Sequence, residues 1–563
     1  MIYHCEDHTC NYWDEGEKLP ERCPQCGRKL LRANEADMTG DDWTALGNTL
    51  WDAEASDKKR MVDCFRKAAY LGSAWGVCNL GICMEQGNGV EADPVQAFWL
   101  YQQAVEMGSL NAVCCLGVCY QYGIGTAPDA KQAAELYRKA AEYGSPRGQM
   151  LLARAFHDGI GVEADAAEAV YWVRAAAYQR YGEGMHRLGV CYEYGDGVEQ
   201  NWEHAVHWFR EAAESGVSVA MTDLGYCYEK GCGVEQSWEQ AFSWYRRGAE
   251  CGNLQSMHNL GCCYEKGRGV EQSWEQAFSW YRRSAECGNP VSMSNLGLCY
   301  QMGYGVEQNW QEAIKWYEQG AQCGDLQSMH NLACCYERGE GVEQNMTEAI
   351  RWYTAAAEGG NADDMYELGW QYDHGEGVEQ DMKKAICWYE RAAEQNYPAA
   401  MNSLGECYAM GRGVPRDLET AMEWYRRAAE LGEAMADYNM GWHLEQAGKL
   451  SEAYAHYRKA ADGNDDSAWW ALGRFYENGV VVAQDGKEAR RCYETGEKLG
   501  SVKCKMRLAR CKLLGIGGRR EKKAGLDLCR QALELAKESS EKEDYGYEAE
   551  MNLLRRTIAE NES

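Results

Sequence analysis

The chain lacks the features that would place it on nucleic acid or in a membrane. No run of lysine and arginine stands out, and 58 Lys and Arg residues against 87 Asp and Glu give a formal net charge of −29. No apolar run approaches the roughly 18 residues that span a bilayer, and the opening stretch MIYHCEDHTC is unlike a secretory signal. Because an acidic body repels phosphate, we expect no nucleic-acid or membrane partner and a cytoplasmic location.

The chain also lacks a recognisable set of catalytic motifs. No P-loop is present, and the recurring Gly-x-Gly-Val segments are expected to be turns between helices rather than phosphate cradles. Ser56 and Lys59 have the Ser-x-x-Lys spacing of β-lactam enzymes, but none of the later motifs of those enzymes follows. We therefore predict that the protein is not an enzyme.

The chain does have repetition over most of its length. Residues 225–251, GYCYEKGCGVEQSWEQAFSWYRRGAEC, return 36 residues later with few changes, and a fixed period of this length is the signature of a stacked-repeat array. In each unit a Leu or Met before a Gly or Ala marks the register, and we call this residue the repeat mark. The marks define 14 units: Leu46, Leu80, Leu116, Leu152, Leu188, Leu224, Leu260, Leu296, Leu332, Leu368, Leu404, Met440, Leu472 and Leu508.

One unit, about residues 218–252, predicts two helices. In the first, Met221, Leu224 and Gly225 follow the i, i+3, i+4 spacing of a buried helical face. Because a helical Gly costs about 1 kcal/mol, its recurrence after the mark indicates a close approach by the partner helix. The second helix begins after an N-cap, which is Ser237 in this unit. Equivalent caps in other units are Asp93, Asp129, Asp165, Asn201, Asn309, Asn345, Asp381 and Asp417.

Three residue types recur at fixed places in the unit. A Trp returns in the second helix of eight successive units, from Trp172 to Trp424, and we predict that it packs between repeats. His186, His258 and His330 recur in every second unit, where surface positions are favoured over a metal site. Nine cysteines stand three positions after the mark, beside the buried Leu, and are expected to be reduced core thiols. They are Cys83, Cys119, Cys191, Cys227, Cys263, Cys299, Cys335, Cys407 and Cys511.

The N-terminal segment does not follow the repeat. Cys5, Cys10, Cys23 and Cys26 form two close pairs, the second as Cys-Pro-Gln-Cys-Gly. Four thiolates in two such pairs suit a tetrahedral Zn²⁺ with no open position, so the site would be structural. The segment resembles the zinc-ribbon (rubredoxin-type) knuckle. His8 has Cys-x2-His spacing from Cys5 and stays open as an alternative to Cys10.

The repeat has the pattern Leu-Gly-x-x-Tyr-x-x-Gly-x-Gly-Val followed by Ala-x-x-Trp-Tyr-x-x-Ala-Ala-Glu-x-Gly. Over about residues 40–530 this pattern resembles the Sel1-like repeat family, which is related to tetratricopeptide repeats. The resemblance implies an all-α fold, a right-handed α-solenoid of about 14 helix–turn–helix units, and a scaffold for protein–protein interaction. The expected divisions are a zinc ribbon with its connector (1–37), the solenoid (38–538) and a C-terminal capping helix (539–563).

The resemblance leaves a second function open. Cys-rich bacterial members of the family have been linked to β-lactam binding, and they carry a periodic disulfide from the end of one second helix to the next first helix. Cys251, Cys287 and Cys323 occupy the first of these positions. Binding or hydrolysis of a β-lactam, or binding of another small ligand, therefore remains the alternative, although the matching later positions hold methionine: Met257, Met293 and Met329.

Candidate partner-binding residues lie on the first helices, which line the concave surface in related solenoids. The residue before the mark is Asn in five units, and repeated amides can hydrogen-bond an extended peptide. The alternative is that each Asn bonds a neighbouring repeat. Units 12 and 13 are rich in aromatic residues, as binding hot spots tend to be, and we expect a monomer that binds a protein or peptide. The candidates are Asn79, Asn259, Asn295, Asn331, Tyr438, Asn439, Trp442 and Trp470.

Overall fold

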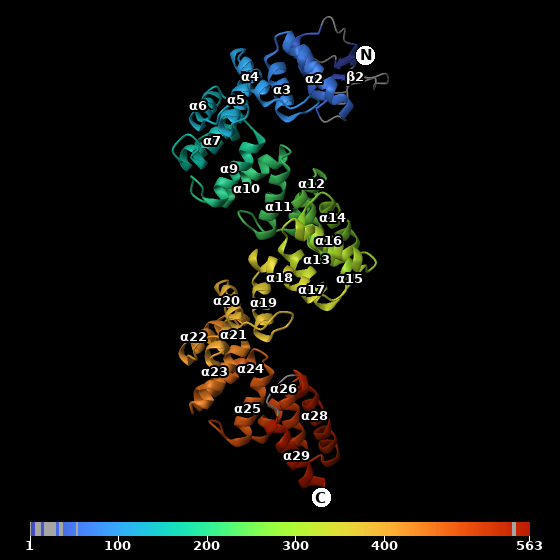
Figure 1. Cartoon of the computed structure of the whole chain (residues 1–563), viewed down its shortest axis with the longest axis vertical. Helices are drawn as coiled ribbons and strands as arrows, with labels where there is room; N and C mark the ends of the chain where they lie inside the picture. Colours follow the sequence, from blue (N-terminus) through green and yellow to red (C-terminus); the bar gives the residue numbers. More distant parts are fainter. Residues whose placement is uncertain are drawn as a thin grey trace. The chain divides into compact units, whose positions relative to one another are not determined.

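The computed structural model describes residues 2–5, 13–15, 30–32, 38–51, 55–542 and 548–562 (Figure 1). Within these ranges, three short strands are followed by 29 α-helices, and none of these helices is long and apolar enough to cross a bilayer. The chain divides into two compact units, Met1–Ser292 with Tyr304–Val306 and Met293–Gly303 with Glu307–Ser563, and each is described by itself.

The first compact unit begins with a small antiparallel sheet of order β2-β1-β3, made by β1 (Ile2–Cys5), β2 (Trp13–Glu15) and β3 (Leu30–Arg32). Fourteen helices follow the sheet within the residues described for this unit. They are α1 (Gly40–Thr49), α2 (Ala55–Tyr70), α3 (Ala74–Gln86), α4 (Pro94–Glu106), α5 (Leu110–Tyr122), α6 (Ala130–Glu142), α7 (Pro146–Asp158), α8 (Ala166–Tyr178), α9 (Gly182–Tyr194), α10 (Trp202–Glu214), α11 (Ser218–Lys230), α12 (Trp238–Glu250), α13 (Leu254–Lys266) and α14 (Trp274–Glu286).

Helix α15 (Pro290–Met302) begins just before the division, and the second compact unit continues the same alternation. Its helices are α16 (Trp310–Gln322), α17 (Leu326–Arg338), α18 (Met346–Glu358), α19 (Ala362–His374), α20 (Met382–Glu394), α21 (Pro398–Met410), α22 (Leu418–Glu430), α23 (Ala434–Gln446), α24 (Leu450–Asp462), α25 (Asp466–Asn478), α26 (Gly486–Lys498), α27 (Val502–Leu514), α28 (Lys522–Lys542) and α29 (Glu548–Glu562). The last of these, α29, packs on α27 and α28.

Each repeat is an antiparallel helix pair whose ends are set by its own sequence. Helix α11 ends at Gly231, which has a φ of 74°, and α12 begins after Ser237, whose side chain accepts a hydrogen bond from the Gln240 amide at 3.3 Å. The second Gly of the turn, Gly233, lies against the Trp202 carbonyl of the preceding second helix and leaves no room for a Cβ. The predicted turn and cap are confirmed, and the Asp and Asn caps predicted for the other units are also N-caps.

A tyrosine ring holds ten of the helix pairs together. In the pair α11–α12, Tyr245 is fully buried, and a Cβ on Gly225 would lie 2.5 Å from its Cε1 atom. The phenol of Tyr245 donates a hydrogen bond to Glu229 Oε2 at 2.9 Å. The recurring Gly after the mark is therefore needed for the close approach of the second helix, as predicted. The same ring is fully buried at Tyr101, Tyr137, Tyr281, Tyr317, Tyr353, Tyr389, Tyr425, Tyr457 and Tyr493.

The predicted cysteine and tryptophan positions differ in burial. All nine cysteines that follow the mark by three residues are buried, as predicted. Of the eight tryptophans, Trp244 is buried and the other seven are half-buried, and six of these seven pack against clusters of buried core residues. An Arg three residues further on covers the ring in several units; Arg247, for example, places its guanidinium carbon 4.2 Å from the Trp244 ring centroid.

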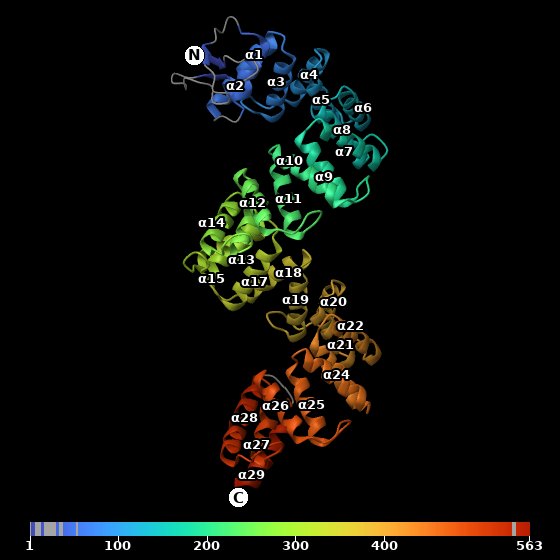
Figure 2. The ribbon, with the colours of Figure 1, turned by 180° about the vertical axis from the view of Figure 1, so that it is seen from behind.

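First helices of successive repeats contact one another directly, as α1 does with α3, α5 with α7, and α25 with α27. Figure 2 shows the succession of pairs from behind. Within each compact unit, we call one side of this row the inner face. It consists, in each first helix, of the residues one and two positions before the repeat mark and two positions after it.

Candidate functional site

The five predicted asparagines lie on the inner face in two environments. Asn259 and Asn295 are partly exposed, and Asn259 accepts a hydrogen bond from Gln255 of its own helix at 2.9 Å. The other three donate from Nδ2 to the preceding repeat, which is the alternative that the sequence left open. These bonds are Asn79 to Asn48 Oδ1 (2.8 Å), Asn331 to Ser294 Oγ (3.4 Å) and Asn439 to Asn402 Oδ1 (3.0 Å).

The three predicted aromatic residues also lie on the inner face, on α23 and α25. Tyr438 is half-buried, and burial raises its pKa to about 12. Trp442 is 38% exposed. Trp470 is covered by two cations, with the Arg474 guanidinium carbon 4.6 Å and Lys503 Nζ 5.2 Å from its ring centroid. Trp442 is therefore the most accessible ring of the three.

The predicted zinc ligands cannot be placed in the same way. Cys5 ends strand β1, where its backbone pairs with Leu30, and its side chain lies outside the described residues. Cys10, Cys23, Cys26 and the alternative ligand His8 also lie outside them. The zinc site stays a prediction.

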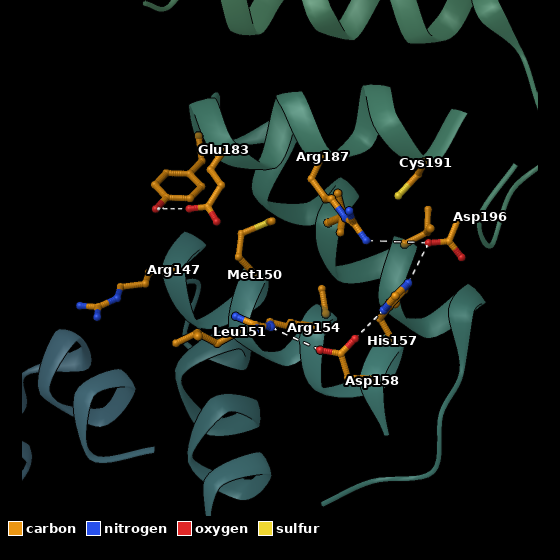
Figure 3. A pocket seen from close by; sticks show the side chains of 15 residues that line it. Arg147, Met150, Leu151, Arg154, His157, Asp158, Glu183, Arg187, Cys191 and Asp196 are labelled. Atoms are coloured by element: carbon orange, nitrogen blue, oxygen red, sulfur yellow. Dashed lines mark hydrogen bonds and ion pairs between the residues drawn. The ribbon is translucent and has the colours of Figure 1, made fainter. Parts of the chain in front are cut away.

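A cavity of about 560 Å³ lies where the fourth repeat departs from the pattern, between helices α7, α8 and α9 (Figure 3). The tyrosine position of the repeat is occupied here by Val173, and the Gly after the mark is Ala153. The residue that accepts the tyrosine hydroxyl elsewhere is His157. Three positions that contact one another in the other repeats have therefore changed together. The two neighbouring repeats keep a buried ring at this place in the core, and the fourth repeat does not.

The floor of the cavity is apolar and its rim is charged. Met150, Ala153, Val170 and Val173 contribute to the floor together with Cys191, whose thiol has a pKa raised by burial to about 11. The rim carries three guanidinium groups and three carboxylates. They are Arg147, Arg154 and Arg187, and Asp158, Glu183 and Asp196.

Most of the rim charges pair with one another. His157 lies between two carboxylates, with Nδ1 2.7 Å from Asp158 Oδ1 and Nε2 3.3 Å from Asp196 Oδ2. Arg154 donates from Nε to Asp158 Oδ2 at 3.3 Å, and Arg187 lies 3.9 Å from Asp196. The His157 hydrogen bond, with Arg154, holds the pKa of Asp158 below its usual range. The rim has no large excess of either charge, which suits an occupant without a strong net charge.

Arg147 hydrogen-bonds outside this rim. Figure 3 shows its guanidinium turned away from the cluster around Asp158. It donates from Nη1 to Asn111 Oδ1 at 2.6 Å, on helix α5 of the preceding repeat. The cavity also borders the inner face, because four of its lining residues, Met150, Leu151, Arg154 and Arg187, belong to that face.

The cavity is a site that the sequence pattern did not reveal, although a signal was present. A buried ring recurs every 36 residues from Tyr101 to Tyr425, as Phe at position 209, and the break in this series at Val173 marks the repeat concerned. A missing tyrosine does not by itself predict a cavity, because Cys529 also stands at a tyrosine position and is fully buried. There Leu513 fills the space and helix α29 packs alongside.

The three recurring histidines also lie on the inner face, and each contacts the next repeat. His186 Nε2 lies 2.7 Å from Asp223 Oδ2, and His330 Nδ1 lies 2.7 Å from Asp364 Oδ1. His258 contacts a serine in the same way. Within the described residues, no group of three or more His, Cys, Asp or Glu side chains is arranged to hold a metal ion.

Comparison with known proteins gives the same architecture. A family model described as Sel1 repeat matches 13 segments: 76–109, 112–145, 146–181, 182–217, 218–253, 254–289, 290–325, 326–361, 362–397, 398–433, 434–465, 468–501 and 502–537. The pair α1–α2 precedes the first match. No curated protein matches this chain.

Among solved structures, c5321, described as a protective antigen of uropathogenic Escherichia coli strains displaying an SLR fold, is 29% identical. That match covers 89% of this chain and 94% of that one, with a TM-score of 0.54. A Sel1 repeat protein from Oxalobacter formigenes is 28% identical over 56% of this chain and 93% of its own, with a TM-score of 0.44. Yeast Tom70 is 14% identical over 88% of this chain and 97% of its own, with a TM-score of 0.32.

Proposed function

Since the chain belongs to the Sel1 repeat family, we propose that it is a non-enzymatic scaffold that binds an extended protein segment along its inner face. One large side chain of that segment enters the cavity beside Val173. The observation that supports this proposal is the cavity itself, because it replaces a ring that the repeat otherwise keeps buried. A pocket with an apolar floor and a few polar rim groups is the usual form of a binding site.

The chemistry of the cavity favours an amphipathic occupant. Its floor offers contacts to an apolar or aromatic body, and its rim offers guanidinium and carboxylate groups to a polar end. A tyrosine, tryptophan or methionine side chain has this character, and aromatic anchors dominate many protein interfaces. The Asn111–Arg147 pair lies beside the cavity, where both groups can hydrogen-bond the backbone that carries the anchor.

The test restores the missing ring. Val173→Tyr combined with Ala153→Gly gives the fourth repeat the residues of its neighbours and fills the cavity. The matched control is Phe209→Tyr, which changes the same position in the next repeat, where the ring is already present and buried. Random peptides displayed on phage would be selected on the full chain, and the affinity of the enriched sequences would be measured for each variant.

We expect the selected peptides to share one large apolar or aromatic residue. Their affinity should fall at least tenfold with the filled cavity and less than twofold with the control. Equal binding by all three proteins would contradict the role of the cavity, and a failure to select any peptide would contradict the scaffold. Saturable binding or hydrolysis of a chromogenic β-lactam would favour the alternative function.

We also propose a structural Zn²⁺ held by Cys5, Cys10, Cys23 and Cys26. The order of the strands supports this, because Cys5 closes β1 and the other three cysteines fall between β1 and β2 or between β2 and β3. Metal analysis of the purified chain should give one zinc per molecule, and Cys23→Ser should abolish it. His8→Ala should leave the zinc in place if Cys10 is the ligand, whereas Cys10→Ala should leave it if His8 is.

A further inference from the structure

Two first helices of the array are nearly identical and place the same side chains together. Helix α13 has the sequence LQSMHNLGCCYEK and α17 has LQSMHNLACCYER. In each, a histidine and the cysteine four residues later share one side of the helix. His258 Nε2 lies 3.5 Å from Cys262 Sγ, and His330 Nε2 lies 3.6 Å from Cys334 Sγ.

The two histidines differ in the group that faces their other nitrogen. His258 Nδ1 lies 3.1 Å from Ser292 Oγ, whereas His330 Nδ1 lies 2.7 Å from Asp364 Oδ1. Asp364 has no exposed surface, and its Oδ2 atom has no hydrogen-bond partner. A buried carboxylate is held in place only by a strong partner, so the pair fixes the orientation of the His330 ring.

The carboxylate also keeps His330 charged. The Asp364 hydrogen bond, followed by that of Cys334, raises the pKa of His330 to about 10 despite partial burial. Burial raises the pKa of Asp364, and the hydrogen bond from His330 opposes that rise. His330 is therefore an imidazolium at neutral pH, and its Nε2–H donates toward the sulfur of Cys334.

The arrangement has the order of an activated nucleophile: thiol, imidazole and orienting carboxylate. A neighbouring imidazolium favours the thiolate, which is the reactive form of cysteine. The His330 side chain is 31% exposed, and Cys334 is a partly exposed free thiol. Both lie on the inner face, where a small reagent can reach the sulfur.

Other groups near the sulfur set limits on this activation. The Tyr353 hydroxyl lies 3.4 Å from Cys334 Sγ and donates a hydrogen bond to Glu337. Glu367 is half-buried on α19, and burial raises its pKa. These acids oppose a second negative charge beside them, and the imidazolium of His330 is the group of opposite charge that faces the sulfur.

We propose that Cys334 is a nucleophilic thiol, activated by His330 and positioned through Asp364, that exchanges with low-molecular-weight disulfides. The sulfur of Cys334 attacks one sulfur of the small disulfide RSSR, its proton having passed to water while the His330 imidazolium faces the thiolate. The S–S bond of RSSR breaks and the mixed disulfide Cys334–S–S–R forms. The other half leaves as a thiolate and takes up a proton as RSH, so Cys334 is oxidised and the leaving sulfur is reduced.

The experiment uses the full chain, glutathione disulfide as the probe, and mass spectrometry to measure modification at each site. Cys334 shares a tryptic peptide, residues 316–338, with the exposed Cys323, and Cys262 shares residues 248–266 with the exposed Cys251. Each exposed cysteine serves as the reference for the inner-face cysteine beside it. At pH 7 we expect the Cys334:Cys323 rate ratio to exceed the Cys262:Cys251 ratio at least tenfold.

Two variants identify the cause. Asp364→Asn keeps the shape and removes the charge, and should lower the Cys334 ratio about tenfold while the NMR titration midpoint of His330 falls by more than one pH unit. Ser292→Asp gives Cys262 the arrangement of Cys334 and should raise its ratio at least threefold. Iodoacetamide in place of glutathione disulfide should give the same ranking, because it reports the nucleophile without a thiol leaving group.

A Cys334 ratio no higher than that of Cys262 in the unmodified chain would overturn the proposal. So would an Asp364→Asn chain in which the His330 midpoint falls but the Cys334 ratio changes less than twofold, because the carboxylate would then be structural only. Hydrogen-exchange protection that persists in α17 and α19 of Asp364→Asn shows that the variant is folded around the substituted residue.

Discussion

Helices α13 and α17 show how one repeat sequence acquires two local chemistries. Both helices begin after a capping side chain, Asn253 or Asp325, and both end at a glycine in the left-handed conformation. The difference arises in the following repeat, which presents Ser292 to one histidine and Asp364 to the other. In a stacked array, the properties of a side chain therefore depend on the neighbouring repeat as much as on its own.

Removal of the buried ring should have the largest effect and should be equal in the two regions. Tyr281→Val and Tyr353→Val each leave a cavity and an unpaired glutamate, at Glu265 or Glu337. We expect each to destabilise its repeat by about 3 kcal/mol, measured locally by hydrogen exchange, because a long array does not unfold in two states. A cost for one ring less than half that of the other would show that the two scaffolds are not equivalent.

Asp364→Asn should remove the difference between the two helices, because His330 of α17 would then face an uncharged group, as His258 of α13 does. The pKa of His330 in the folded protein, about 10, is above the ordinary value of about 6.5. The pair with Asp364 therefore stabilises the protein fully below about pH 6.5, and this stabilisation is lost as the pH rises towards 10. We expect the variant to lose about 2 kcal/mol at pH 6 and almost nothing at pH 10.5. Hydrogen exchange at both pH values measures this, and a loss independent of pH would contradict the ion pair.

Ser284→Ala removes a hydrogen-bonding hydroxyl beside α13 that has no counterpart beside α17. The Ser284 hydroxyl donates to the Leu254 carbonyl and accepts from Ser292, each at 2.9 Å, whereas α18 has Ala356 at this position. We expect a loss of about 1.5 kcal/mol in the protection of α13 and α14. The reverse change, Ala356→Ser, should be close to neutral, and a comparable gain there would show that the serine network is not specific to α13.

The smallest effect should come from the one core position at which the two helices differ. Ala333→Gly should cost about 1 kcal/mol through helix propensity. Gly261→Ala should not stabilise the protein by the same amount, because a Cβ at Gly261 would lie 2.6 Å from Tyr281 Cε1. Hydrogen exchange in α17 and α13 measures the difference, and a stabilising Ala333→Gly would contradict it.

Features that depend on a few adjacent residues could be predicted from the sequence. The cap at Ser237 and the turn at Gly231 need only their own neighbours along the chain, and both are found where the pattern placed them. The requirement for Gly225 could also be inferred, because a costly residue at a fixed place indicates a close contact. The identity of the contacting ring, Tyr245, required the structure.

Features that depend on the next repeat could not be predicted. The sequence left the roles of Asn79 and Asn439 open because the partner of an amide lies in another unit, and the stacking geometry decides whether it is reached. The contact between His330 and Asp364 spans 34 residues for the same reason. The cavity at Val173 needed knowledge of where the tyrosine ring packs before its absence had a meaning.

The glycine-rich turns have a consequence for how the chain is made. The second glycine of a turn, such as Gly233, lies on the start of the preceding second helix, at Trp202. During synthesis the ribosome releases the earlier repeat first, so the surface that receives each turn already exists when the turn emerges. Each new pair of helices can therefore dock on a finished template, and the array can grow in the direction of translation without waiting for its C-terminus.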